Sequence, residues 1–559
     1  MQSGFTCTLD QNIWAHEASE YFATKWGRDD ENARGGLQQF LAYSEGAAMC
    51  LKGTQVNNAF ASLRHQRRLD CSGISVLALR FLCEADPEPF ARLLDNLLCS
   101  SASLQSLEIV AYAKGKGTNR PTVEELRCIV PLPSILQVAD VLLAAEINDF
   151  VNAVLPCPDC CFEGAVKFTQ PLDIAHGLSL GLERGLDDHS NLGIAQADIR
   201  QYYDSLNVLQ LALWLHHEGL SKAWAAAIVR MQMLPALTLC TGDCKSTVAV
   251  RSNGSLTGSR VAGALGRIPV MSVVSQRSFL WKALGFKLED SALAVCTYVD
   301  NLYSIAHTPA DAIAILEDFE LHLQLNWGLT IKPSSRAVFV PRRLDIAEDH
   351  DMEKWPVRSH FPVLGHLLDA AGSSWPCWQN TKRNMWRAFF SNCTGTLVKD
   401  LPASTRERLM GRCVLPICDF RSSRWSFHAS LAADLDRQQR KMTSILARIP
   451  RCADEADAVY FRRRHRQISS HCKSQGLWSL RHAARVCAWN AHLHRPQNAR
   501  SWAARLLHWH GRDWLASQRL AQGTPSLGGR TGTRAGPGCP CPRWHDGVVA
   551  AETVLAAVI

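Results

Sequence analysis

The sequence predicts an α+β fold, in which a segment of mixed strands and helices is followed by a long helical region. Apolar runs at 192–197 and 293–299 are strand-like, and helical runs lie between them. From residue 376 to about 520 the apolar residues recur at helical spacing. A sheet-containing part followed by a helical part is typical of the α+β class.

The composition describes a folded protein of several domains or subdomains. The chain has 559 residues, of which 47% are hydrophobic and 20% are charged. Charged residues interrupt every apolar run in residues 1–30, so no secretory signal is expected there. No run reaches the roughly 18 apolar residues that a membrane span needs. With 21 cysteines, we expect an intracellular, mostly reduced protein without membrane contact, in either nucleus or cytoplasm.

The charge is distributed unevenly along the chain. Residues 401–559 contain 25 Lys and Arg against 10 Asp and Glu, although the whole chain has a formal net charge of only +8. A basic C-terminal third indicates a polyanionic partner, and nucleic acid is the leading candidate. The alternative is an Arg-rich composition with solvated helix faces.

Two short acidic motifs follow the two strand-like runs. The first is Asp198-Ile-Arg-Gln-Tyr-Tyr-Asp204, and the second is Tyr298-Val-Asp300-Asn301. Carboxylates at the tips of neighbouring strands are what a two-metal phosphoryl-transfer site requires, with Mg²⁺ ions about 3.5–4 Å apart. Taken singly, Asp204 is also typical of the N-cap of a helix over 205–220, and Asp300-Asn301 of an ordinary turn.

Further segments surround these motifs in a fixed order. They are Asp70-Cys-Ser-Gly73-Ile74, Lys114-Gly115, Arg127-Cys-Ile129, Gly254-Ser-Leu-Thr-Gly258, Gly328-Leu-Thr-Ile-Lys332-Pro-Ser-Ser-Arg336 and Phe361-Pro-Val-Leu-Gly365. Together with the acidic motifs, they resemble the reverse transcriptase domain of non-LTR retrotransposons, from about residue 66 to residue 370.

The resemblance implies a right-handed fingers–palm–thumb polymerase with an antiparallel palm sheet. It divides the chain into an N-terminal helical extension (1–65), fingers (66–190), palm with the remaining fingers segments (191–375), a helical thumb and basic region (376–520) and a flexible tail (521–559). Gly, Pro, Thr and Arg are abundant in that tail.

The resemblance also implies roles for individual residues. Asp198 and Asp300 would hold two Mg²⁺ ions, with Asn301 standing where the family has a second aspartate. The implied nucleotide-binding residues are Lys114 and Arg127 for the phosphates, Tyr203 to exclude a 2′-hydroxyl, and Gly258 in the segment along the template. Lys332 is a candidate general acid for the leaving pyrophosphate.

The implied activity is that of an RNA-directed DNA polymerase, a nucleotidyltransferase acting on an RNA template, a DNA primer and dNTPs. Departures from the family pattern at Asn301, Thr257, Ala262 and Ser335 favour a second hypothesis, a degenerate copy that binds nucleic acid without catalysis. A third is an RNA-templated RNA polymerase. The chain shows no endonuclease or ribonuclease H pattern.

The remaining motifs are less specific. The cluster Arg462-Arg-Arg-His-Arg466 is interpreted as a phosphate contact, and most tryptophans of the helical third as core anchors. Zinc is not supported, because Cys157-Pro-Asp-Cys160-Cys161 and the tail residues Cys539, Cys541 and His545 are incomplete ligand sets.

Overall fold

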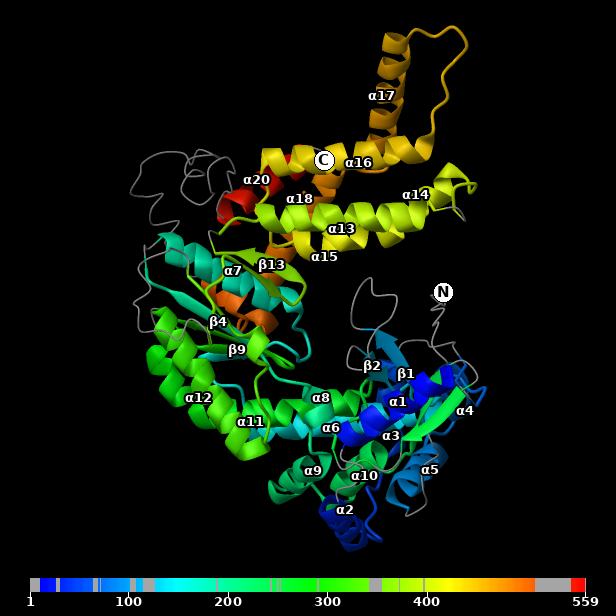
Figure 1. Ribbon diagram of the computed structural model, residues 1–559, viewed down its shortest axis with the longest axis vertical. Helices are drawn as coiled ribbons and strands as arrows, with labels where there is room; N and C mark the ends of the chain where they lie inside the picture. The colour runs from blue at the N-terminus through cyan, green and yellow to red at the C-terminus, as the bar shows by residue number, and fades with distance from the viewer. Residues whose placement is uncertain are drawn as a thin grey trace. The chain divides into compact units, whose positions relative to one another are not determined.

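A computed structural model gives the structure of the chain (Figure 1). The residues that it describes are 11–26, 31–63, 69–70, 72–100, 107–113, 126–187, 190–241, 244–248, 251, 253–288, 291–340, 354–370, 372–395, 398–507 and 544–557.

The chain divides into two units, and each is interleaved in sequence with the other. The first comprises Met1–Pro158, Asp198–Arg277 and Asp318–Lys332, and the second Asp159–Ala197, Ser278–Glu317 and Pro333–Ile559. Two long helices, α11 (Arg260–Leu284) and α12 (Pro309–Trp327), contribute residues to both units.

The first unit is mainly helical and contains a four-stranded sheet of order β2-β1-β5-β6. Strands β1 and β5 are parallel, and the two outer pairs are antiparallel. Its strands are β1 (Leu107–Ala113), β2 (Leu126–Ile129), β5 (Leu237–Thr241) and β6 (Cys244–Val248). Its helices are α1 (Gln11–Lys25), α2 (Glu31–Tyr43), α3 (Gly53–Ser62), α4 (Val76–Cys83), α5 (Glu88–Cys99), α6 (Ser134–Val154), α8 (Tyr202–Ser205), α9 (Val208–His217) and α10 (Lys222–Met233).

The second unit is built around a five-stranded sheet of order β11-β4-β10-β9-β3. These strands are β3 (Cys161–Glu163), β4 (Gly193–Asp198), β9 (Val295–Tyr298), β10 (Asn301–Ala306) and β11 (Ala337–Phe339). The strand-like runs at 192–197 and 293–299 are thus confirmed as strands. The prediction of an antiparallel sheet is wrong at one edge, where Cys161–Glu163 of β3 pair in parallel with β9. The chain is therefore a mostly helical protein with a mixed sheet.

Two short hairpins and a set of helices complete this unit. The hairpins are β7 (Phe286–Leu288) with β8 (Ser291–Leu293), and β12 (His360–Val363) with β13 (His366–Asp369). The helices are α7 (Pro171–Asp187), α13 (Trp375–Cys393), α14 (Ala403–Cys413), α15 (Leu415–Ser422), α16 (Ala429–Ala447), α17 (Asp457–Ser474), α18 (Trp478–Leu493) and α20 (Trp544–Ala556), with short 3₁₀ turns at Pro333–Ser335 and Pro496–Asn498. Among the helices that the structure describes, none is both long and apolar enough to cross a membrane.

Tryptophans anchor the helical third, as the sequence predicts. Trp425, Trp478, Trp489 and Trp502 are at most 5% exposed and belong to its apolar clusters. Such large rings bury much apolar surface between helices. Trp509 and Trp514 lie outside the described residues.

The prediction of a flexible tail over 521–559 is wrong for the last described helix. Helix α20 packs against α18, and Trp544 is 1% exposed. A Cβ on Gly547 would lie 2.6 Å from the backbone nitrogen of Phe427, so glycine permits this close approach. The helix has an apolar face. Its pattern is hard to recognise in the sequence, because Gly and Pro are abundant just before it.

Buried neutral histidines make this unit sensitive to acid. Burial, together with the nearby His428, lowers the pKa of His482 to about 3, and its two ring nitrogens have no hydrogen-bond partner within the described residues. The unfolded chain, with an ordinary histidine pKa of about 6.5, binds this proton more readily. The stability is therefore fully present above pH 6.5 and is lost as the pH falls towards 3.

We expect this one histidine to contribute about 2 kcal/mol of the loss in unfolding free energy between pH 7.5 and pH 5. Urea unfolding of wild type and His482→Leu at both values measures it, since the variant lacks the titrating group. An equal pH dependence in both proteins would contradict the assignment. His465→Leu, at an exposed position on α17, is the matched control.

Candidate functional site

Two carboxylates lie at the ends of neighbouring strands of the five-stranded sheet. Asp198 is the last residue of β4, and Asp300 directly precedes β10, the neighbour of β4. At the other end of β4, a Cβ on Gly193 would lie 2.3 Å from Cα of Pro309, which follows β10. The start of β4 thus adjoins the end of β10, so the strands run in opposite directions. Asp198 and Asp300 are therefore placed at the same edge of the sheet.

The turn that carries Asp300 has a strained backbone. Val299 has φ of 59°, in the left-handed region that β-branched residues rarely adopt. Tyr298 and Asn301 pair across the turn as the first residues of the β9–β10 ladder. The pairing of the two strands holds the turn in this conformation, and with it the partly exposed side chain of Asp300.

Asn301 contacts the carboxylate that precedes it. Its Nδ2 donates to Oδ1 of Asp300 at 3.0 Å and lies 3.5 Å from the carbonyl oxygen of Tyr298. An aspartate at this position would repel Asp300, whereas the amide donates a hydrogen bond to it. Asn301, the residue that departs from the resembled motif, thus orients the side chain of Asp300.

The backbone on the other side of Asp198 is also fixed. Lys332 donates its backbone N–H to the carbonyl of Asp198 at 2.8 Å, and Arg200 donates to the carbonyl of Thr330 at 2.8 Å. These bonds extend β4 by an antiparallel bridge between Ile199 and Ile331. The exposed Lys332 therefore lies one backbone hydrogen bond from Asp198, and its role as a general acid stays a prediction.

Tyr203 follows a second left-handed residue, Gln201, whose φ is 47°. The preceding Tyr202 is buried and donates its hydroxyl to the carbonyl of Gly266, so the two tyrosines have different environments. The ring of Tyr203 is half-buried, and a Cβ on Gly266 would lie 3.5 Å from its edge. The absence of a side chain at residue 266 leaves room for both rings.

The segment Gly254–Gly258 depends on its two glycines. Gly254 has φ of 85° and Gly258 has φ of 106°, values that favour glycine. A Cβ on Gly258 would lie 3.0 Å from the side chain of Ile129, at the end of β2. Thr257 accepts a hydrogen bond from the backbone N–H of Val130 at 2.9 Å. The exposed Gly258 thus lies beside the strand that carries Arg127.

Two nucleotide-binding candidates are only partly located. Arg127 lies on β2, and its backbone pairs with Tyr112 of β1, whereas its side chain is outside what the structure describes. Lys114, the residue after β1, lies outside the described residues. Their roles remain predictions.

Sequence reasoning missed a set of buried polar residues around the Gly254–Gly258 segment. Asp140, inside the apolar helix α6, accepts hydrogen bonds from Ser259 Oγ, from Arg260 N at 2.7 Å and from Val261 N at 3.1 Å. It thereby caps α11. Burial raises the pKa of Asp140, against the effect of these hydrogen bonds. A polar residue in an apolar helical run was the only signal in the sequence.

Gln232 and Arg251 hold the same segment from a second side. The amide of Gln232 accepts from Leu256 N at 2.9 Å and donates to Ser259 Oγ at 3.0 Å. The guanidinium of Arg251, 2% exposed, donates to the carbonyls of Gln232 and Gly254. These contacts between distant segments fix a turn that its own sequence would leave free.

Asp204 has a different role from the one its position suggests. The cap of the following helix, α9, is Asn207, whose side chain accepts from Gln210 N at 2.9 Å, and the helix begins at Val208. The prediction that Asp204 caps a helix over 205–220 is therefore wrong. Asp204 instead pairs with Lys25 and Trp26 at the end of α1.

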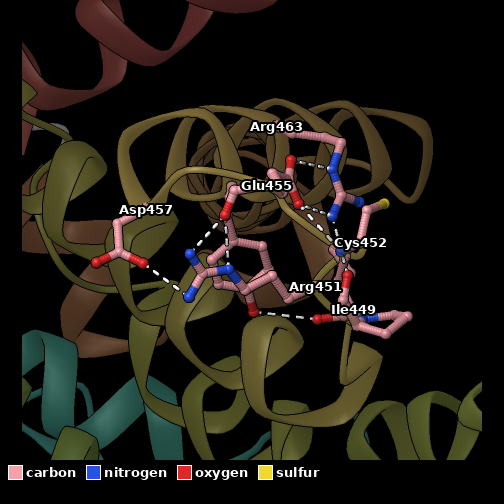
Figure 2. Close-up of polar contacts among 8 residues, drawn as sticks. Ile449, Arg451, Cys452, Glu455, Asp457 and Arg463 are labelled. Carbon is pink, nitrogen blue, oxygen red and sulfur yellow. Dashed lines mark hydrogen bonds and ion pairs between the residues drawn. The ribbon is translucent and has the colours of Figure 1, made fainter.

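The Arg462–Arg466 cluster divides into paired and exposed residues. Arg463 donates to both oxygens of Glu455, at 2.9 and 2.7 Å, and Arg464 donates to Ser444. Figure 2 shows Arg463 and Arg451 converging on Glu455, while Arg451 also pairs with Asp457. Of these four arginines on α17 (Figure 1), Arg462 and Arg466 are exposed, whereas Arg463 and Arg464 are partly buried. Arg463 and Arg464 are thus engaged within the protein, and the phosphate contact of the cluster stays a prediction.

The donors at the sheet edge suit magnesium in kind. Asp198 and Asp300 offer the hard carboxylate oxygens that Mg²⁺ prefers, from strands held in a sheet. Within the described residues no group of three or more His, Cys, Asp and Glu is placed to hold a metal ion. Two carboxylates are therefore the charged donor set at this edge, and Asn301 engages one of them. Of the zinc candidates, Cys539 and Cys541 lie outside the described residues.

Comparisons with known proteins find matches among solved structures. No protein-family model and no curated protein matches the chain. Among solved structures, the chain is similar to an apo telomerase from Candida tropicalis truncated from its C-terminal domain, with 12% sequence identity and a TM-score of 0.32. The match covers 48% of this chain and 55% of that one, so the chain spans about half the length of its solved counterpart. At these values the similarity does not assign an activity.

Replacing Asp140 tests the first of the missed contacts. Asp140→Ala should lower the free energy of unfolding by about 2–3 kcal/mol, because it leaves the buried N–H groups at the start of α11 without an acceptor. Asp149→Ala, at an exposed position on the same helix, should change it by less than about 0.5 kcal/mol. Denaturant unfolding measures the unfolding free energy of both variants. An equal loss in the two would contradict the capping role of Asp140.

Proposed function

We propose that the protein is an RNA-directed DNA polymerase of retroelement origin, built as fingers, palm and thumb. The observation that carries the proposal is that Asp198 and Asp300 lie at the ends of neighbouring strands of one sheet, with the left-handed Val299 directly before Asp300 in the β9–β10 turn. The ordered motifs between residues 66 and 370 support the same reaction. Nucleotidyl transfer needs chiefly positioned charge, and a rigid sheet edge supplies it.

In this proposal each residue acts on the substrate according to its chemistry. Asp198 and Asp300 would hold Mg²⁺, which when bound lowers the pKa of a primer 3′-hydroxyl and neutralises triphosphate charge. Lys114 and Arg127 would bind the phosphates, one as a point charge and the other as a bidentate donor. Tyr203 would pack under the sugar and leave no room for a 2′-hydroxyl, and Gly258 would let the backbone approach the template. Lys332 would donate a proton to the leaving pyrophosphate.

The helical region after residue 376 would bind the template–primer duplex. Arg462, Arg466 and the exposed Lys473 recur on one face of α17 at intervals of four and seven residues. Cations at this spacing suit contacts with a phosphate backbone, which give salt-dependent binding without sequence preference.

Primer extension on an RNA template, with Mg²⁺ and all four dNTPs, tests the proposal. Asp198→Ala and Asp300→Ala should each reduce extension at least about a hundredfold, because each removes a charge that stabilises the transition state, while duplex binding stays within about twofold. Asp149→Ala should extend like the wild type.

Extension by Asp198→Ala comparable to that of the wild type would refute the role of this carboxylate. Absence of extension by the wild type, in Mn²⁺ as well as Mg²⁺, would refute the polymerase assignment itself.

The second candidate function is that of a catalytically degenerate, nucleic-acid-binding relative. The hydrogen bond from Asn301 to Asp300 favours it, because that contact occupies an oxygen of the one carboxylate in the turn. In that case duplex binding would persist without extension.

Asn301→Asp separates the two functions. If the amide limits catalysis, the variant should gain extension by about tenfold or more, because it adds a charged metal ligand. Extension lower than that of the wild type would mean that Asn301 serves the reaction by orienting Asp300. Asn326→Asp, on α12 away from the turn, controls for the added charge.

A further inference from the structure

The N-terminal helix α1 ends against the segment that carries Tyr203. This helix packs on β5 and β6 of the first unit. At its end, Lys25 Nζ lies 2.6 Å from Oδ2 of Asp204, and Trp26 Nε1 donates to Oδ1 of Asp204 at 3.2 Å. Both oxygens of the carboxylate next to Tyr203 thus bind residues from a helix about 180 positions earlier in the chain.

This ion pair is shielded from water. The side chain of Lys25 is 10% exposed and that of Asp204 is 24% exposed. The buried guanidinium of Arg251 lies 5.7 Å from the ring of Trp26. Burial lowers the pKa of Arg251 to about 10, and the charge of Asp204 acts in the opposite direction. Pairs in such surroundings depend on geometry far more than solvated surface pairs do.

The same residues connect α1 to the Gly254–Gly258 turn. Asn253 donates its backbone N–H to the carbonyl of Trp26 at 3.1 Å, and Ser255 donates to the carbonyl of Tyr203 at 2.9 Å. A Cβ on Gly254 would lie 2.8 Å from the ring of Trp26, so the turn packs directly on the indole. Trp26 therefore contacts both the carboxylate beside Tyr203 and the turn.

We propose that Asp204, through Lys25 and Trp26, holds Tyr203 and the Gly254–Gly258 turn in one arrangement. Helix α1 thereby contributes to the site that selects the nucleotide. Asp204 is a positioning residue, because it acts through Tyr203 and the turn rather than on the substrate. The selecting role rests on the proposed polymerase function, whereas the mechanical coupling does not.

The test uses the full chain and two readouts. Lys25→Glu places a second negative charge beside Asp204, so hydrogen exchange in peptides covering 253–259 should become about tenfold faster. The preference for dNTPs over rNTPs in primer extension should fall about fivefold, a change that a general loss of stability would not produce. The double variant Lys25→Glu/Asp204→Lys should restore both quantities to within about twofold of the wild type.

Arg80→Glu, an equal charge change at an exposed position of the same unit, should alter neither readout. If Lys25→Glu loses protection throughout the chain, Lys25→Met, which keeps the apolar stem, should still speed the exchange of 253–259 about threefold. Unchanged exchange of that segment in the variants would overturn the coupling.

Altered exchange with an unchanged nucleotide preference would overturn the selecting role. A wild type that does not extend primers would refute the polymerase function, and the exchange data would then still decide the coupling.

Discussion

The antiparallel pairing of β4 with β10 is the constraint on which the candidate site depends. It requires the chain after β10 to pass directly over the start of β4, where a side chain at Gly193 would meet the backbone of Pro309. Only glycine permits this approach without displacing backbone. Because the strands are fixed at that end, their opposite ends bring Asp198 and Asp300 to one edge. The pairing of the strands thereby brings together two acids that are about a hundred residues apart in the sequence.

The surroundings of these acids store strain that the strand and loop contacts hold in place. Gln201 and Val299, which lie within the two acidic motifs, both adopt the left-handed conformation. Conformations of this kind persist when surrounding structure determines them, and they are concentrated at functional sites. Here the backbone bonds of Lys332 and Arg200 on one side, and the Tyr298–Asn301 pair on the other, do so.

The sequence predicted local features well, because their causes are local. Apolar runs ending in acidic residues became β4 and β9, and the turn at Asp70 closes through hydrogen bonds from Ser72 and Ile74 to its own carboxylate. Contacts between distant segments have no local sequence pattern from which they could be predicted. The partners of Asp204 and the cap that Asp140 supplies arise only when the chain folds back on itself. Helix α20 has only a weak compositional signal, because the segment directly before it is rich in Gly and Pro.

The arginines of the helical third show the same distinction between local pattern and tertiary structure. Arg451, Arg463, Arg481 and Arg485 all pair with carboxylates of their own region, at Asp457, Glu455 and Asp419. A cation already neutralised within the protein displaces few counterions when a polyanion binds. Counterion release scales with the phosphates that are newly neutralised, about 0.9 per contact on duplex DNA. If this region binds a duplex as proposed, its formal charge therefore overstates how steeply the affinity would fall with salt.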